Sequence, residues 1–230
     1  MIFHLPRVLS PEQVSALRAQ LNPSTFVDGM QTGGDYVRNI KSNREARIDT
    51  EAVRRLDATV QTALAANNDF QIVALPLRVA PFIFSSYTPG LFYGDHTDNA
   101  VMGRSTGEPL RADLSMTIFL SDPAEYDGGE LVIDTDLTPA AYKLQAGDAV
   151  VYPCYSLHRV EPVTRGERLA AVGWIQSQIR FPQQRQTLID LAHVLSWMLT
   201  AMPDGRAHEH PEFRRLEKVR ANLTRMWSET

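Results

Sequence analysis

A series of short apolar segments between residues 71 and 175 most constrains what this chain can fold into. Each segment spans only a few residues, and Gly, Pro, Asp or Asn residues separate it from the next. The segments are residues 71–75, 77–87, 114–120, 130–133, 149–152 and 169–175. Strands of this length, separated by turns, are typical of a β-sandwich or a β-barrel.

Helical patterns flank the predicted strands. Ser10 and Gln13 form a capping-box pattern ahead of an apolar stripe, and Thr50 suits the cap position of a second helix. Two further helices are predicted at residues 182–200 and 211–227, where apolar residues recur at helical spacing.

The predicted fold class is therefore α+β. Residues 1–76 are expected to form an N-terminal support region that contains the helices and irregular or short-strand structure. Residues 77–180 are expected to form the β core, and residues 181–230 a C-terminal helical pair. The apolar faces of this pair can pack on the core or on a second copy of the chain, so a homodimer is one expectation.

The composition, with 43% hydrophobic and 22% charged residues, is ordinary for a soluble globular protein. A net charge of −4 gives no electrostatic reason to expect nucleic acid or an anionic membrane as a partner. Cys154 is the single cysteine, so no intrachain disulfide can form. No secretion signal is recognisable, and no apolar run approaches the roughly 20 residues of a membrane span. We expect a cytoplasmic protein.

Three residues are candidates for a metal site. His96 and Asp98 lie two positions apart, so on a strand their side chains would point to the same face and could share one ion. His158 follows the predicted strand at residues 149–152. Two histidines and one carboxylate form the facial triad that binds Fe(II) and leaves coordination positions open. Each residue alone is weak evidence, because a single histidine is more often satisfied by a backbone carbonyl.

Arg168 lies ten residues after His158, at the start of a predicted strand. A guanidinium among apolar neighbours needs an anion, and its planar fork suits a carboxylate. The alternative is a structural salt bridge with Glu161 or Glu167. Arg165 is a rival in the preceding turn, where we expect it to be exposed.

The order and spacing of these residues resemble the Fe(II)/2-oxoglutarate dioxygenases: His-x-Asp, then His about sixty residues later, then Arg. The surrounding sequence is closer still to the bacterial PKHD-type hydroxylases, which are relatives of the prolyl 4-hydroxylase catalytic domain. The similar stretches cover nearly the whole chain and are residues 1–14, 84–93, 113–126, 127–131, 151–160, 162–168 and 227–229.

The resemblance implies a double-stranded β-helix, or jelly roll, which makes the position of Arg168 reasonable. In a plain hairpin Arg168 would pair near Val163, about 15 Å along the strand from His158. In a jelly roll, successive strands cross between two sheets, so Arg168 can face the metal from deeper in the barrel.

The resemblance also implies the chemistry. His96, Asp98 and His158 would bind Fe(II), and 2-oxoglutarate would bind as co-substrate with its distal carboxylate on Arg168. Tyr87 is a second co-substrate candidate, although it could equally be a packed tyrosine with its hydroxyl in water. With O2, the enzyme would hydroxylate a prime substrate, a peptide residue or a small molecule, and release succinate and CO2. L-ascorbate as reductant and a link to bacterial iron homeostasis are implied in the same way.

Two other functions compete with this interpretation. A jelly-roll metal-binding or sensing protein without turnover would use the triad but has no need of Arg168. A metal-dependent hydrolase or isomerase on a cupin-like barrel would require a further general base and usually more histidines.

Several other polar residues carry less weight. Tyr93, Ser115 and Thr117 could line the site. Cys154 is expected to be a small buried residue and not a ligand, since the triad is complete without it. The His208–His210 stretch looks like a metal motif, but we expect it to be solvated in the break before the last helix.

Overall fold

The computed structural model describes residues 1–31, 38–47, 50–103, 107–202 and 206–229. The helices are α1 (Pro11–Gln20), α2 (Glu51–Ala66), α3 (Asn68–Ala74), α4 (Pro182–Ala201) and α5 (Pro211–Trp227), with 3-10 turns η1 (Pro23–Thr25), η2 (Gly29–Gln31), η5 (Pro123–Glu125) and η7 (Ala207–Glu209). The strands of the larger sheet are β1 (Phe3–Leu5), β2 (Phe26–Asp28), β4 (Arg44–Ala46), β5 (Pro76–Val79), β6 (Ile83–Tyr87), β10 (Leu114–Phe119), β14 (Ala149–Pro153) and β17 (Arg168–Ser177). Those of the smaller sheet are β3 (Lys41–Ser42), β7 (Phe92–His96), β12 (Leu131–Ile133), β13 (Ala140–Tyr142) and β15 (His158–Val160). Two short pairs are β8 (Val101–Met102) with β9 (Leu110–Arg111) and β11 (Tyr126–Gly128) with β16 (Val163–Gly166).

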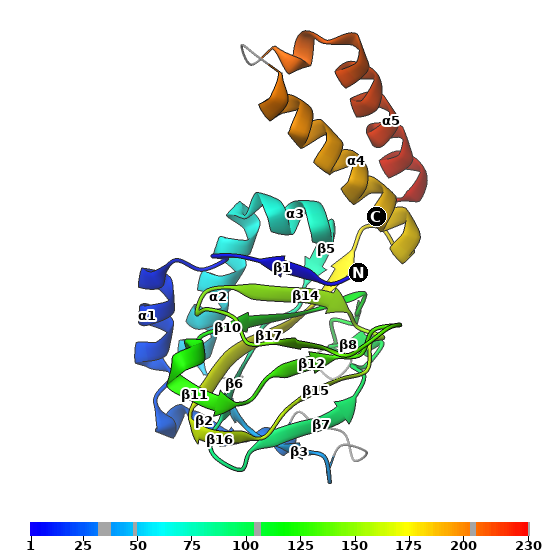
Figure 1. Ribbon diagram of the computed structural model, residues 1–230. Helices are drawn as coiled ribbons and strands as arrows, with labels where there is room; N and C mark the ends of the chain where they lie inside the picture. The colour runs from blue at the N-terminus through cyan, green and yellow to red at the C-terminus, as the bar shows by residue number, and fades with distance from the viewer. Residues whose placement is uncertain (32–37, 48–49, 104–106, 203–205, 230) are drawn as a thin grey trace.

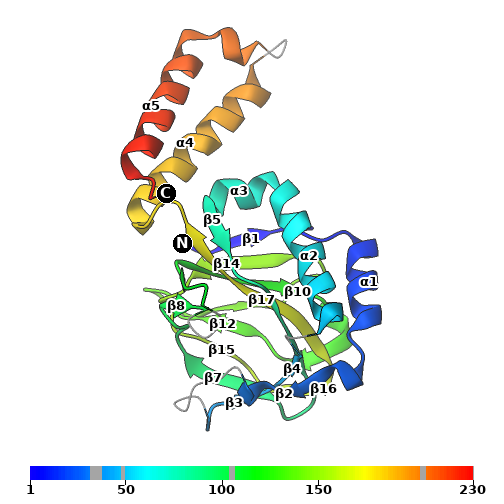
Figure 2. The ribbon, with the colours of Figure 1, turned by 180° about the vertical axis from the view of Figure 1, so that it is seen from behind.

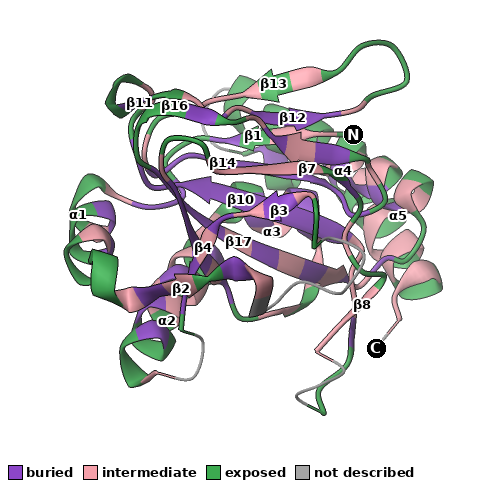
Figure 3. Ribbon diagram, turned by 90° about the horizontal axis from the view of Figure 1, so that it is seen from below, coloured by how far each residue is buried: buried purple, intermediate pink, exposed green. Residues whose placement is uncertain are grey.

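Two facing antiparallel sheets form the centre of the protein (Figure 1). Within the described residues the larger sheet has eight strands in the order β1-β14-β10-β17-β6-β4-β2, with β5 beside β17. The smaller sheet has five strands in the order β13-β12-β15-β7-β3. Figure 3 shows buried residues concentrated on the strands of both sheets and exposed residues on the helices and loop tips. The predicted α+β jelly roll is confirmed.

Helices α1, α2 and α3 cover the outer face of the larger sheet (Figure 2). The first two begin at the predicted caps. The Ser10 hydroxyl accepts from the Gln13 amide while the Gln13 side chain accepts from the Ser10 amide, and Thr50 accepts from the Val53 amide. These bonds satisfy amide groups that a helix start otherwise leaves without partners.

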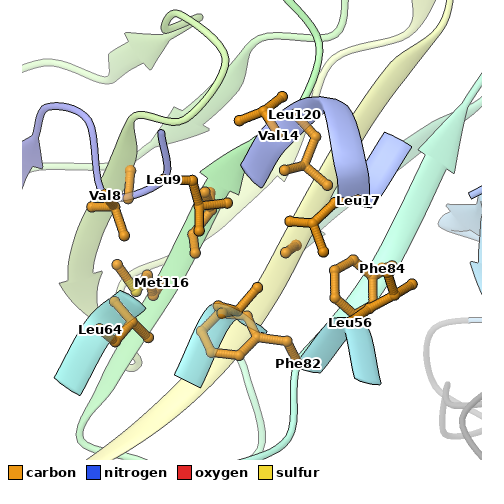
Figure 4. Close-up of a cluster of buried hydrophobic side chains, with 14 of the residues drawn as sticks. Val8, Leu9, Val14, Leu17, Leu56, Leu64, Phe82, Phe84, Met116 and Leu120 are labelled. Carbon is orange, nitrogen blue, oxygen red and sulfur yellow. The ribbon is translucent and has the colours of Figure 1, made fainter. Parts of the chain in front are cut away.

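The main apolar core lies between these helices and the sheet (Figure 4). Alternate residues of each strand point to it, as the period of two requires. Residues Leu114, Met116 and Ile118 of β10 join this core, while the residues between them face the other sheet. The side chains of Ser115 and Thr117 therefore point into the space between the two sheets.

Replacing Phe84 with alanine should lower the free energy of unfolding by about 3–5 kcal/mol, because its fully buried ring would leave a cavity. Urea unfolding followed by circular dichroism measures this change. Phe181→Ala is the matched control, since Phe181 is 56% exposed and its loss should change stability by less than about 0.5 kcal/mol. Equal effects of the two substitutions would contradict the assignment of Phe84 to the core.

The chain crosses from one sheet to the other between His158 and Arg168. β15 lies in the smaller sheet between β12 and β7, β16 pairs with β11, and β17 lies in the larger sheet between β10 and β6. Arg168 therefore pairs with Tyr87 of β6 and not with a residue near Val163. The crossing that favoured a jelly roll over a hairpin is confirmed.

Residues 71–75 do not form a strand, so that prediction was wrong. Residues up to Ala74 belong to α3, and Leu75 ends the helix in the left-handed conformation, with φ 42°. The Asn67 side chain caps α3 by accepting from the Phe70 amide, and Phe70, Val73 and Ala74 are buried on one face. The segment was too short for this helical spacing to stand out from an apolar strand. The predicted strand at residues 77–87 is likewise divided, into β5 and β6.

The two C-terminal helices are confirmed and pack against each other in a hairpin that projects from the jelly roll (Figure 1). An apolar cluster joins them; its buried members are Leu195, Met198, Ala207 and Phe213. In the part of the chain that the structure describes, no helix has the length and apolar character to cross a membrane. The division of the chain at residues 76 and 180 stays a prediction.

Candidate active site

His96, Asp98 and His158 come together in the interior of the jelly roll. His96 and His158 are paired across β7 and β15, and Asp98 follows two residues after the end of β7, so the expected continuous strand stops at His96. One ligand atom from each residue lies within 4.8 Å of the others. Among the described residues, this is the one group of three or more His, Cys, Asp or Glu side chains that could hold a metal ion.

Both imidazoles are held through Nδ1, and His158 Nε2 lies 3.8 Å from Asp98 Oδ2. His96 Nδ1 lies 2.8 Å from the Gly94 carbonyl oxygen, and His158 Nδ1 lies 3.0 Å from that of Ser156. A carbonyl only accepts, so each Nδ1 carries the proton and each Nε2 keeps its lone pair. Burial, and then the neighbouring His158, lowers the pKa of His96 to about 4. His96 is therefore neutral at pH 7, which is the form that binds metals.

Ser115, on the facing sheet, holds the Asp98 carboxylate. Its hydroxyl donates to Asp98 Oδ2, and its oxygen lies 2.9 Å from Cys154 Sγ. Because the serine proton goes to the carboxylate, the thiol is the donor in the second contact. Burial raises the pKa of Cys154, so it stays a thiol, and it is not part of the metal-type cluster. Ser115, which was expected only to line the site, thus orients one of its candidate ligands.

Arg168 is 1% exposed and faces the same interior. Its guanidinium carbon lies 5.2 Å from the centre of the Tyr87 ring and 5.4 Å from that of Phe119. Its Nε is buried without a hydrogen-bond partner, and no carboxylate within the described ranges forms an ion pair with it. A buried cation in this state is costly unless an anion joins it.

The alternative partners of this arginine are occupied elsewhere. Glu161 pairs with Arg159, at 2.7 Å between Oε1 and Nε. Glu167 accepts a hydrogen bond from the Ser86 hydroxyl. Arg165, the rival guanidinium, is exposed in the turn and forms a surface ion pair, as expected.

Tyr87 is 3% exposed, so its hydroxyl does not lie in water and that alternative is wrong. Asn43 Nδ2 lies 3.4 Å from the Tyr87 hydroxyl and 3.4 Å from Glu45 Oε1. The Glu45 carboxylate can only accept, so Asn43 must present its NH2 group to Glu45 and to the Tyr87 oxygen. The Tyr87 oxygen therefore accepts from Asn43, and the Tyr87 proton can be donated to another acceptor. Burial raises the pKa of Tyr87 to about 12, which keeps it protonated.

The sequence reading missed this polar cluster on β3 and β4. Lys41, Asn43 and Glu45 are all buried, and Lys41 Nζ lies 2.7 Å from Glu45 Oε1. Their spacing of two residues was the available signal, because alternate residues of an extended chain share a face. The pattern was obscured by the polar and glycine-rich residues around it.

Tyr152 lies beside the candidate metal ligands and also beside the aromatic neighbours of Arg168. Its ring lies edge-on to His158, with 5.1 Å between ring centres. Burial raises its pKa well above the usual range; Asp98 acts in the same direction, while a hydrogen bond with Thr117 and the charge of Arg168 oppose the shift. Tyr152 also packs in one apolar cluster with Tyr87 and Phe119, the two rings beside Arg168, so the triad and the guanidinium face a common interior. Thr117 lies there as expected.

The remaining candidates are placed as follows. Tyr93 stacks on His96, with 3.6 Å between ring centres. His208 packs on the Phe213 ring, and His210 Nδ1 caps α5 by accepting from the Glu212 amide, so this stretch belongs to the helix boundary. Trp174, which sequence reasoning did not select, is paired with Ser115 across β17 and β10, and its indole Nε1 is buried without a hydrogen-bond partner among the described residues.

Comparison with known proteins places the chain in a family. A family model for the 2OG-Fe(II) oxygenase superfamily matches residues 82–176. A PKHD-type hydroxylase of Picosynechococcus sp. is 43% identical over 229 residues, which cover 100% of both chains. A PKHD-type hydroxylase of Maricaulis maris is 42% identical over 233 residues, again covering 100% of both chains.

Solved structures share the fold. A Pseudomonas putida prolyl-4-hydroxylase is 24% identical, with a TM-score of 0.54, over 76% of this chain and 92% of its own. The similarity to the PKHD-type hydroxylases covers the whole chain. The chain therefore belongs to the PKHD-type hydroxylases of the 2OG-Fe(II) oxygenase superfamily and is a 2-oxoglutarate-dependent dioxygenase.

Proposed function

We propose that His96, Asp98 and His158 hold the Fe(II) of this dioxygenase and that Arg168 binds the distal carboxylate of 2-oxoglutarate. The observation that carries the proposal is a buried guanidinium that has no carboxylate partner among the described residues and faces the same interior as the three clustered ligand atoms. A metal-binding protein without turnover would give Arg168 no role.

The residues fit the metal. Two imidazole nitrogens and one carboxylate oxygen suit Fe(II) and leave open positions for a chelating co-substrate and O2. Each histidine has its Nδ1 on a carbonyl, and the aspartate has its oxygen on Ser115. Such partners orient metal ligands before the ion binds.

The iron, when bound, supplies the oxidative chemistry that hydroxylates the substrate and releases succinate and CO2. The protein's own part is binding, orientation and exclusion of water. Arg168 fixes one end of 2-oxoglutarate, and Tyr87, with its hydroxyl proton left free by Asn43, donates to the keto acid. The unpartnered Trp174 indole is a donor for the prime substrate, which is a peptide residue or a small molecule.

Other features of the proposal rest on resemblance to the family. L-ascorbate serves as reductant, and the enzyme acts in the bacterial cytoplasm in a process linked to iron homeostasis. A homodimer through the projecting helices is supported by exposed apolar side chains on α4 and α5, among them Trp197 at 66% and Met226 at 72%.

The test is an anaerobic titration of the metal-free protein with Fe(II) and then 2-oxoglutarate. Formation of the chelate should produce its weak visible charge-transfer band at one equivalent of iron. In air, the loaded enzyme should release succinate. Absence of the band in folded, iron-loaded protein would contradict the proposal and leave metal binding alone as the function.

Replacing Ser115 with alanine should weaken Fe(II) binding by roughly 10- to 100-fold, the usual effect of removing a partner of a metal ligand. The reason is that Asp98 Oδ2 loses its donor from the facing sheet. Isothermal titration under nitrogen measures the affinity. Ser86→Ala is the control, because this buried serine bonds a different carboxylate, that of Glu167. Equal affinities in the two variants would show that Ser115 does not position Asp98.

A further inference from the structure

Arg185, near the start of α4, is a second buried guanidinium without a carboxylate partner. The residue is 5% exposed, and within the described residues it forms no ion pair and one side-chain hydrogen bond, from Nη1 to the Ile179 carbonyl oxygen at 2.9 Å. A guanidinium has five N–H donors, so most of them remain for another acceptor. A buried cation in this state is costly unless an anion joins it. The function proposed above gives Arg185 no role.

Two carboxylates lie at this end of the larger sheet, and both are bound to other guanidinium groups. Asp113 Oδ1 lies 2.8 Å from Arg111 Nε. Glu229 lies 2.5 Å from Arg111 Nη1 and 2.7 Å from Arg180 Nε. Of the three guanidinium groups, Arg185 is the one without a carboxylate partner in the described part of the chain.

A series of hydrogen bonds places Arg185 beside the end of β17 (Figure 1). The Ser177 amide donates to Asp113 Oδ2, and the Ile179 amide donates to the Ser177 hydroxyl oxygen. The Ile179 carbonyl in turn accepts from Arg185. Burial lowers the pKa of Arg185, and the charge of Asp113 opposes this shift, as expected for neighbouring side chains.

Asp113 lies at the end of a row of side chains that leads to the metal ligands. Ser115 points into the space between the sheets and donates to Asp98, and Asp113 lies two positions earlier on the same face. Cys154, which contacts Ser115, is also near Arg185, because burial raises the pKa of this thiol and the charge of Arg185 acts against that rise. Arg185 therefore lies at one end of the interior that contains the triad.

This end is not the one that contains Arg168. Arg168 begins β17 and Ser177 ends it, so the two ends of this ten-residue strand are about 30 Å apart. Trp174, near the Ser177 end, is paired with Ser115. The two buried guanidinium groups thus lie on opposite sides of the candidate metal ligands, and one small ligand cannot reach both.

An exposed aromatic ring accompanies Arg185. Tyr155 is 67% exposed and lies three positions before His158, in the turn that leads into β15. Like Asp113, it acts against the lowering of the Arg185 pKa by burial, so the phenol and the guanidinium are neighbours. An exposed ring can pack against the apolar part of a ligand whose carboxylate meets the planar fork of an arginine.

We propose that Arg185 is a prime-substrate-binding residue that takes a carboxylate of the substrate, while Tyr155 packs against the adjoining part of the same molecule. The inference rests on the proposed function, since it takes the triad as the reaction centre. It deepens that function by assigning the prime substrate to a chemical class, the organic acids, which includes acidic peptide side chains and small carboxylic acids.

The experiment compares benzoate with its neutral analogue benzamide on iron-loaded protein saturated with 2-oxoglutarate under nitrogen, at constant ionic strength. Benzoate should raise the Tm of the wild type, and the dependence on concentration gives its dissociation constant. Arg185→Gln keeps a donor for Ile179 but removes the charge, and should raise this constant roughly 10- to 100-fold without changing the effect of benzamide. Arg180→Gln, at a half-exposed guanidinium paired with Glu229, is the matched control and should bind benzoate like the wild type.

The ligand-free Tm separates binding from structure. Arg185→Gln should keep or raise it, because a buried charge without a carboxylate partner is removed. A large fall would overturn the inference in favour of a structural role. So would equal benzoate constants in Arg185→Gln and wild type, or no benzoate effect on wild type that forms the charge-transfer band. Absence of that band would instead overturn the proposed function.

A further arm identifies the source of the carboxylate. N-acetylglutamate α-methylamide presents a carboxylate on a peptide unit. Tighter Arg185-dependent binding of this compound than of benzoate would support an acidic peptide side chain as the substrate group, and weaker binding would support a small acid.

Discussion

His158→Ala is expected to abolish stoichiometric Fe(II) binding and, with it, succinate release. The substitution removes one of three ligand atoms that lie within 4.8 Å of one another. Loss of a partner of a metal ligand already costs about 10- to 100-fold in affinity, so loss of a ligand itself should exceed that range. The side chain is buried and bonded to the Ser156 carbonyl, hence its orientation is set before metal arrives.

The measurement is metal content after reconstitution, together with anaerobic titration calorimetry. His193→Ala is the control, because His193 is exposed on α4 and outside the cluster. Circular dichroism establishes that both variants are folded. One equivalent of iron in His158→Ala, with an unchanged charge-transfer band on adding 2-oxoglutarate, would remove His158 from the site.

Arg168→Ala is expected to raise the dissociation constant of 2-oxoglutarate by about 150- to 5,000-fold while Fe(II) binding stays near that of the wild type. Removing one member of a buried charge pair typically costs about 3–5 kcal/mol, which corresponds to this range. The titration of the charge-transfer band gives the constant directly. Arg165→Ala, in the exposed ion pair with Asp127, should bind 2-oxoglutarate like the wild type.

A volume-conserving variant separates binding from structure. In the ligand-free protein Arg168 is a buried cation without a described carboxylate partner, so Arg168→Met should keep or raise the Tm. If Arg168 instead held the fold together through an ion pair, Arg168→Met would lower the Tm and the affinity for 2-oxoglutarate would follow the loss of folded protein. We therefore expect Arg168→Met to bind 2-oxoglutarate more weakly than the wild type while its Tm stays the same or rises.

Local signals predicted much of the fold. Caps and helical periodicity at Ser10, Thr50, Pro182 and Pro211 located four helices almost to the residue. The one segment assigned to the wrong type, residues 71–75, was short and mostly apolar, so a strand and a helix have the same pattern there. The sequence predicted that most of the apolar segments form strands, but not which strands pair with each other. Pairing joins residues far apart in the chain, such as β1 with β14.

By itself, the sequence predicted which groups carry the chemistry, since His96, Asp98, His158 and Arg168 stand in the order and spacing that resemble the dioxygenase family. Only the tertiary structure decided what surrounds them. Ser115, on the facing sheet, donates to Asp98. Asn43, between β3 and β4, donates to the Tyr87 hydroxyl. The Tyr126 ring and the Arg168 side chain both lie next to Gly129. These contacts depend on sheet register and on the crossing of strands between sheets, and a shift of one residue in register would turn every such side chain to the opposite face.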